Sequence, residues 1–262
     1  MSAKSFWLVF LILSLALLLG PVILMAEGFG SNMRKARNSM SKGEFENAIT
    51  EYQGALHSKP RSVEAQSWLG IAYERRGDQL LKSGETDQAI EAYRNALASV
   101  PEDAFWHEHL AVALEKKGDR DAALKEYQTA TRMLPLDGGL QKQYERISGG
   151  PQGADDANSG KVRMGEHPEK VGGTVSAPIP IYKPEPRYSD RARNARLQGT
   201  LKLWVVIDSG GNVSDTTAIE VLGLGLDANA IETVRTWKFR PARRNGIPVP
   251  VKVSVEIAFR LS

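Results

Sequence analysis

The spacing of hydrophobic residues changes three times along this chain. Residues 6–26 are uncharged and almost entirely apolar, residues 29–148 repeat small and apolar residues at helical spacing, and residues 174–262 end in segments that alternate every second position. These patterns predict a membrane-length helix, a set of packed helices and a sheet, respectively. Residues 149–173 are rich in Gly, Asp, Asn and Ser and predict a flexible linker. We therefore expect an anchor over 1–28, an all-α region, a linker and an α+β domain.

The apolar run from Phe6 to Ala26 predicts a segment that crosses a membrane. As a helix it would span roughly 32 Å, and a hydrocarbon core is about 30 Å thick. The competing interpretation is a cleaved signal peptide, with Lys4 as the basic start and Ala26 before the cut. The run is longer than the usual apolar part of such a peptide, so we expect an uncleaved anchor.

The middle region repeats one pattern of small and aromatic residues. An alanine is followed by a tyrosine four positions later, an alanine seven positions later and a proline twelve positions later. The first three share one helical face, the small alanines let neighbouring helices approach, and the proline ends the helix. The pattern occurs three times: Ala48, Tyr52, Ala55 and Pro60; Ala89, Tyr93, Ala96 and Pro101; Ala123, Tyr127, Ala130 and Pro135.

This pattern resembles the tetratricopeptide repeat (TPR), which implies units over about 29–62, 63–103 and 104–137, closed by a helix over 138–148. The second unit has seven residues more between its leading and following helices than the third, close to two helical turns. Stacked helix pairs form a curved groove that binds a protein or peptide. A passive spacer that holds the last domain away from the membrane is the alternative.

The last part of the chain predicts an antiparallel three-stranded sheet with two helices. The expected order is a helix over Tyr188–Leu197, strands over Thr200–Ile207 and Asn212–Val221, a helix from Leu226 through Trp237, and a strand over Val249–Leu261. Pro241 is expected to end the second helix and Asp227 to cap its start. The last strand alternates apolar and polar residues and leaves an edge that no later residue of this sequence covers.

Several motifs of this part occur in a characteristic order. Tyr188 precedes the hairpin Asp208–Asn212, and Leu226-Asp227 precedes a run that reads Trp-Lys-Phe-Arg-Pro-Ala at 237–242; Gly246 and Pro248 follow. In this order the segment 174–262 resembles the C-terminal domain of TonB, the energy transducer of Gram-negative envelopes. The family often reads Tyr-Pro where this chain reads Tyr188-Ser189, so the tyrosine matches and the proline does not.

The resemblance implies that the last strand pairs with a short extended segment, the TonB box, of an outer-membrane receptor. An edge strand has unpaired N–H and C=O groups that can accept one more strand. The residues expected to bind this partner are Arg187, Tyr188, Val249, Val251, Lys252, Val253, Ser254, Val255, Glu256 and Ile257.

For the whole chain, the resemblance implies a single-pass inner-membrane protein with its bulk in the periplasm, which engages an Exb-type proton-channel complex and drives nutrient transport. Anchor helices of the family carry a histidine toward that complex, but here every histidine lies at or beyond His57. The alternative is therefore a non-energised periplasmic scaffold built from the same two modules.

Other chemistry is not indicated. The chain has no cysteine, so disulfides and thiolate zinc sites are excluded. His107 and His109 lie two apart on a helix and point in different directions, which disfavours a shared metal. Gly223-Leu224-Gly225 lacks the third glycine and the βαβ unit of a nucleotide loop, and predicts a bend. We therefore expect no enzyme and no cofactor. We also expect no nucleic-acid partner, since the basic residues behind the net charge of +3 form no basic stripe.

Overall fold

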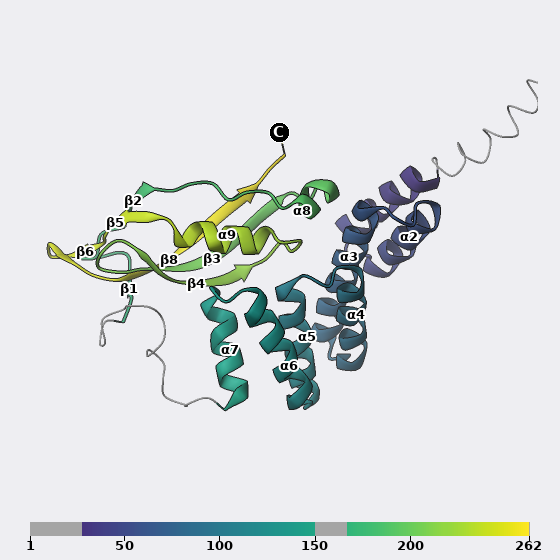
Figure 1. Ribbon diagram of the computed structural model, residues 1–262, viewed down its shortest axis with the longest axis horizontal. Coiled ribbons are helices and arrows are strands. Elements are labelled where there is room, and N and C mark those ends of the chain that lie inside the picture. The colour runs from purple at the N-terminus through teal and green to yellow at the C-terminus, as the bar shows by residue number, and fades with distance from the viewer. Residues whose placement is uncertain (1–27, 150–166, 262) are drawn as a thin grey trace, which may run out of the picture.

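The computed structural model describes residues 28–149 and 167–261, and it places an all-helical region beside a domain that contains strands (Figure 1). Within those two ranges no helix has the length and apolar character needed to cross a membrane. The apolar run 6–26, with the expected anchor, lies outside them, as does most of the expected linker.

The helical region consists of antiparallel neighbours that pack in chain order. Each repeated tyrosine is almost completely buried, and the repeated alanines beside it are fully buried, because they fill and line the seam between adjacent helices. The helices are residues 28–41, α2 (Phe45–Ser58), α3 (Val63–Ser83), α4 (Thr86–Ser99), α5 (Ala104–Lys117), α6 (Arg120–Met133) and α7 (Gly138–Ser148).

The additional residues of the second unit all lie in α3, which has 21 residues where α2, α4, α5 and α6 have 14. Two glycines of α3 keep this longer helix close to its neighbours. A Cβ added at Gly70 would lie 2.7 Å from the ring of Trp106, and one at Gly77 would lie 2.5 Å from the ring of Tyr93. The glycines therefore make room for the rings of Trp106 in α5 and Tyr93 in α4.

The strand-containing domain is built on a four-stranded sheet in the order β1-β8-β3-β4, with α9 along one face (Figure 1). The three long strands are antiparallel, as the sequence predicts. The elements are β1 (Glu169–Lys170), β2 (Ile179–Tyr182), α8 (Asp190–Ala195), β3 (Gly199–Ile207), β4 (Val213–Glu220), α9 (Leu226–Arg235), β5 (Lys238–Arg240), β6 (Arg243–Arg244), β7 (Ile247–Pro248) and β8 (Val251–Phe259).

The second helix of this domain is shorter than the sequence predicts. It ends at Arg235, and Trp237 lies beyond it, 2% exposed, with its indole Nε1 donating to the carbonyl of Pro184 at 3.0 Å. The next residues form β5, which pairs with β2, and the amide of Phe239 donates to Gly211 at 2.8 Å. These tertiary bonds, rather than Pro241, draw the chain out of the helix.

Asp227 does not cap α9, contrary to the expectation. The residue at the cap position is Gly225, which has a left-handed conformation and no side chain. The carboxylate of Asp227 turns back and accepts the amides of Leu222 at 2.8 Å and Gly223 at 2.6 Å. It therefore holds the bend before the helix, because the amide of Gly223 is buried and that of Leu222 is partly buried, and both need an acceptor.

A fourth strand enters the sheet from the segment expected to be linker. Glu169 and Lys170 pair in parallel with Val251 and Lys252 at the start of β8. The sequence predicts only that no later residue covers this edge; in the structure a segment that precedes the domain in the chain covers its first two residues.

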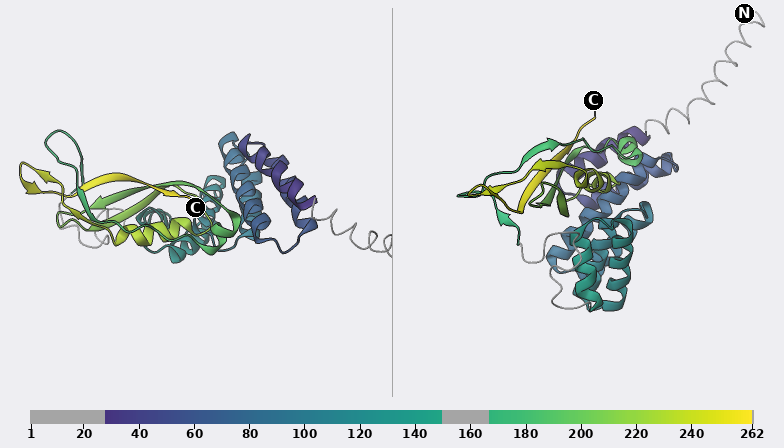
Figure 2. Two further views of the ribbon diagram at one scale, coloured as in Figure 1. Left: turned by 90° about the horizontal axis from the view of Figure 1, so that it is seen from above. Right: turned by 60° about the vertical axis from the view of Figure 1, so that its left-hand side comes forward.

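The two regions pack directly against each other, although the sequence predicts separate modules joined by a linker. One cluster of buried residues runs from Phe105 and Leu140 of the repeats to Leu203 and Ile231 of the sheet domain. In both views of Figure 2 the sheet domain lies against the repeat helices. The indole of Trp68 in α3 donates to the carbonyl of Ala195 in α8 at 2.8 Å.

Two aspartates at the starts of repeat helices bind both regions at once. Asp103 caps α5 with Oδ1, and its Oδ2 accepts the amide of Leu224 at 2.8 Å. Asp137 caps α7 through the amide of Leu140 at 2.8 Å, and its Oδ2 accepts the amide of Ala218 at 3.0 Å. Each carboxylate thus satisfies backbone donors on two sides of the interface.

The start of α7 lies close against β4, and two glycines leave the space for this contact. A Cβ added at Gly138 would lie 2.0 Å from an oxygen of Asp215, and one at Gly139 would lie 2.7 Å from the methyl group of Thr217. In the sequence Asp-Gly-Gly at 137–139, the aspartate caps α7 and accepts an amide of β4, and the two glycines leave space for β4 to approach.

We predict that Asp103→Ala lowers the free energy of unfolding by about 2–4 kcal/mol, because it removes a helix cap and leaves the buried amide of Leu224 without an acceptor. Asp119→Ala is the matched control: Asp119 caps α6 in the same way, with an exposed bond to Ala122, and should cost only about 1 kcal/mol. Urea titration of both variants measures the difference. Equal losses would contradict the cross-domain role of Asp103.

We also predict that stability falls as the pH rises from about 4 to about 7. Burial, and then the charge of Asp103, raise the pKa of Asp227 to about 7. The folded protein keeps a proton that the unfolded chain, with an ordinary Asp pKa, has released, so this contribution is complete below pH 4 and is lost through pH 7. The slope is at most about 1.4 kcal/mol per pH unit for one proton. Asp227→Asn should flatten this slope, and an unchanged slope in that variant would contradict the assignment.

Candidate strand-pairing site

The free backbone groups of β8 are defined by its two neighbours. β8 pairs with β3 along its whole length, from Val251 opposite Ile207 to Phe259 opposite Gly199. On its other side, the carbonyl of Pro250 accepts the amide of Glu169 at 2.9 Å. Since successive residues of a strand point their backbone groups to opposite sides, every second residue after Pro250 faces away from β3. These residues are Lys252, Ser254, Glu256 and Ala258.

The parallel register of β1 uses the backbone groups of Lys252, but it does not extend to Ser254. Among the described residues, no strand is paired with β8 from Val253 to Phe259 on the side opposite β3. The free edge therefore comprises the backbone groups of Ser254, Glu256 and Ala258. Six residues from Ser254 to Phe259 extend over about 20 Å.

The opposite edge of the same sheet is closed by the repeats. The amide of Ala218 in β4 donates to Asp137, and the hydroxyl of Thr216 donates to the carbonyl of Leu136 at 2.9 Å. Lys142 of α7 also lies 3.8 Å from the carboxylate of Asp215. A strand that joins this sheet has access to β8 and not to the middle of β4.

The two faces of β8 differ in polarity beside the free edge. On the helix side Val253 and Val255 are only half-buried, although Val251 and Ile257 on the same face are buried. The outer face is polar: Lys252 lies over the ring of Trp204 with its Nζ 5.0 Å from the ring centre, and Lys202 forms an ion pair with Glu256 at 3.1 Å. An added strand with apolar residues on the helix side would complete the burial of the two valines.

Tyr188 lies beside the far end of the free edge. Its ring meets Phe259 edge-on, with 5.3 Å between centroids, and its hydroxyl donates to the carbonyl of Leu197 at 2.7 Å. Arg187 is exposed, and its carbonyl accepts the side chain of Asn229 at 2.9 Å. The tyrosine is therefore fixed by packing and by a hydrogen bond, whereas the arginine side chain points into solvent.

The predicted binding residues fall into three groups in the structure. Val249 precedes β8 and donates its amide to Ala242, and Val251 is completely buried in the core beneath β1. Lys252 faces the edge that β1 occupies. From the predicted set, Ser254 and Glu256 present backbone groups on the free edge, as does Ala258, which sequence reasoning missed. Val253, Val255 and Ile257 point their backbone groups toward β3 and their side chains toward the helix side of the sheet. The two-residue periodicity of the strand was a signal for Ala258.

The two histidines on α5 have different neighbours. His107 pairs with Glu126 at 2.6 Å, and His109 pairs with Glu74 at 3.2 Å and lies 3.9 Å from Asp78. Glu74, Asp78 and His109 are close enough to share a metal ion. However, Arg75 also contacts Glu74 at 3.3 Å, and the nearby carboxylates raise the pKa of His109 to about 9 despite its burial. The cluster is therefore an ion-pair network of His109 with two carboxylates, in which the buried Nδ1 of His109 has no partner in hydrogen-bond geometry.

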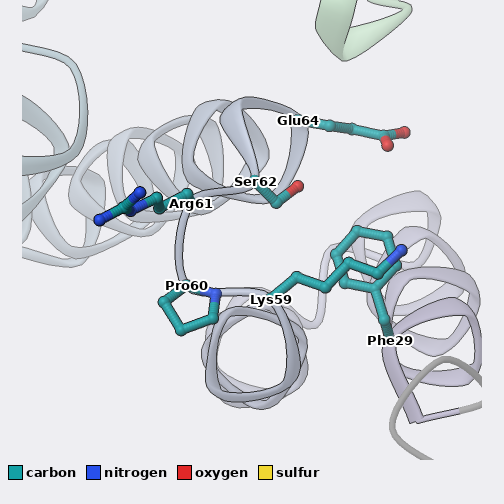
Figure 3. Close-up of a pocket in the computed structure, with 6 residues that line it drawn as sticks. All are labelled: Phe29, Lys59, Pro60, Arg61, Ser62 and Glu64. Carbon is teal, nitrogen blue, oxygen red and sulfur yellow. The ribbon is translucent and has the colours of Figure 1, made fainter. Parts of the chain in front are cut away.

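A hollow of about 600 Å³ lies between the first helical residues and the start of α3 (Figure 3). The Lys59 ammonium lies 4.5 Å from the centre of the Phe29 ring, and Glu64 forms an ion pair with Arg37. In Figure 3 the Arg61 side chain points away from Phe29. The polar groups that line the hollow do not converge on one point, so it is not comparable with a ligand site.

The class defined by these features is a protein-interaction protein with two modules: a stack of helical repeats and a sheet domain with an open edge. Comparison with known families is consistent with this class. The Gram-negative bacterial TonB protein C-terminal family matches residues 184–261. Two tetratricopeptide repeat families match residues 39–77 and 75–137. The chain thus carries a TonB-type C-terminal domain preceded by TPR repeats.

Known proteins match parts of the chain. Protein TonB of Vibrio cholerae serotype O1 is 32% identical over an aligned length of 97 residues, and the match covers 34% of this chain and 40% of that protein. This chain therefore matches less than half the length of its relative. The crystal structure of MamA protein is 20% identical with a TM-score of 0.29, covering 47% of this chain and 84% of the other. The TPR domain of Arabidopsis OM64 is 13% identical with a TM-score of 0.34, covering 48% and 98%.

Proposed function

We propose that this protein is a TonB-like transducer of the cell envelope, which binds outer-membrane receptors by adding an extended receptor segment to the free edge of β8. The observation that carries the proposal is a sheet with one edge closed by the repeats and the other left open by residues 28–149 and 167–261 over Ser254–Phe259. The match of this domain to the TonB C-terminal family supports the choice of receptor as partner.

The edge also suggests the chemistry of the partner. Backbone bonds to Ser254, Glu256 and Ala258 would supply affinity, because no strand among the described residues pairs with these groups. Selectivity would come from alternate side chains: apolar ones over Val253 and Val255, and polar ones beside the Lys202–Glu256 pair. Tyr188 would close the far end of the bound segment.

The apolar run Phe6–Ala26 would hold the chain in the inner membrane as a single-pass anchor, with the two modules in the periplasm. Coupling to an Exb-type proton channel would supply energy for transport of nutrients. The groove of the repeats would bind a further protein or peptide.

A non-energised periplasmic scaffold is the second candidate, and a specific observation favours it. The anchor run contains no histidine. A pull-down from membranes distinguishes the two functions: a transducer brings down Exb-type subunits together with receptors, and a scaffold brings down neither or receptors alone.

We predict that Ser254→Pro lowers the affinity for receptor peptides by at least about tenfold, because it removes an amide that faces the free edge while leaving the β3 ladder intact. The probes are short overlapping peptides tiled along the periplasmic N-terminal segments of outer-membrane receptors. Binding is measured by fluorescence anisotropy.

Glu256→Ala is the control for this variant, because alanine retains the amide, and it should change the affinity by less than about threefold. Circular dichroism must show that both variants are folded. A folded proline variant that binds like the parent would rule out edge pairing at Ser254.

We predict that alkaline phosphatase fused after Ser262 is active, since that enzyme requires the periplasm and the proposed anchor leaves the modules there. N-terminal sequencing of the membrane-bound fusion should find residues 6–26 retained. An inactive fusion, or a mature chain that begins at Glu27, would contradict the anchored topology.

A further inference from the structure

A short segment of the chain itself already occupies part of the proposed receptor edge. Glu169 and Lys170 form β1, which runs parallel to β8 and pairs with its first two residues, Val251 and Lys252. The segment lies where a receptor strand would lie if it extended toward the start of β8. Beyond Lys170 the chain leaves the sheet.

After β1 the chain turns away from the sheet in a tight turn. Gly172 and Val175 exchange two backbone hydrogen bonds of 3.0 Å each. Gly172 and Gly173 have φ values of +130° and +60°, which glycine adopts without the strain that a side chain would add. This reversal takes the backbone away from Ser254, so β1 cannot continue along the free edge.

The segment is fastened behind the turn. Val175 is 7% exposed and belongs to the main buried cluster. Ser176 donates its amide to the carbonyl of Arg243, and its hydroxyl accepts the amide of Arg243, both at 2.9 Å. Arg243 and Arg244 form β6 of a hairpin with β7, whose turn residues Asn245 and Gly246 have φ values of +50° and +82°.

The front of the segment is also held. Glu169 forms an ion pair with Arg244, and its amide donates to Pro250. β1 is therefore tied to the hairpin at Glu169 and again at Val175 and Ser176. It behaves as a part of the sheet and not as a passing contact.

We propose that β1 is a register stop: it blocks the first two residues of β8, so that a bound receptor strand pairs only along Ser254–Phe259 and ends at Val253. This inference rests on the proposed function and specifies which part of the edge the receptor uses. It limits the paired length to about six residues and fixes which side chains of the partner meet Val255 and Tyr188.

Amide hydrogen exchange tests the stop, using a receptor peptide that the parent protein binds and nested shorter and longer versions of it. In the free parent protein the Lys252 amide should exchange slowly, because it bonds to β1, while those of Ser254, Glu256 and Ala258 exchange fast. Peptide binding should protect these three. Affinity should stop rising once the peptide covers them.

Glu169→Pro removes the amide that bonds to Pro250 and should release β1. In this variant the Lys252 amide should exchange fast in the free protein, and longer peptides should protect it and bind at least about threefold more tightly than the shortest saturating one. Glu169→Gln retains the amide and serves as the control, with the length limit of the parent. Both variants should remain folded, because the remaining bonds of the sheet are unchanged.

The outcomes separate the two ideas. If the parent binds no receptor peptide of any length, the proposed function fails and the register stop fails with it. If the parent binds peptides but its affinity continues to rise with lengths beyond Ser254, or if Glu169→Pro leaves the length limit unchanged, the register stop alone is wrong.

Discussion

The two carboxylate oxygens of Asp137 accept hydrogen bonds from different modules, and the position of the sheet domain on the repeats depends on these bonds. One oxygen accepts the amide of Leu140 in the first turn of α7, and the other accepts an amide on the outer edge of β4. Asp103 does the same at α5 and Leu224. A buried amide without an acceptor is costly, so these bonds fix how the sheet sits on the helix starts. The helix glycines at 138 and 139 let the contact form.

This arrangement determines which edge of the sheet can bind a partner. The repeats cover β4, the strand β3 lies in the interior, and β8 is left with free backbone groups. A stack of repeats that only served as a spacer would not need to touch the domain. Here the repeats pack against the sheet domain, and buried residues of the two modules form one hydrophobic core.

The position of β1 at the start of β8 also matters for the open edge. It leaves the repeats at α7, which lies against β4, and the described chain resumes before β1, on the opposite edge of the same sheet. The two described stretches on either side of residues 150–166 therefore lie at opposite edges of the sheet, and the second begins with the strand that pairs with β8. The open part of the edge is what remains between β1 and Tyr188, so its length is set by two anchored segments.

Much of this could be predicted from local pattern. The repeated alanines and tyrosines are buried as their spacing indicates, because helix packing selects small and large residues at fixed intervals. The alternation of β3 and β8 identified their buried faces. Trp237 was misplaced because its apolar spacing continues that of α9, while the bond to Pro184 that holds it outside the helix joins residues far apart in sequence.

The sequence by itself determined the two modules, their order and the strand on which the proposed site lies, since periodicity and turn residues are local properties. Only the tertiary structure decided the role of Asp103, Asp137 and Asp227, whose carboxylates bind amides that no spacing rule relates to them. It also decided that β1 covers the start of β8. Two residues with no apolar pattern become a strand only because the edge of β8 offers backbone groups that local sequence does not specify.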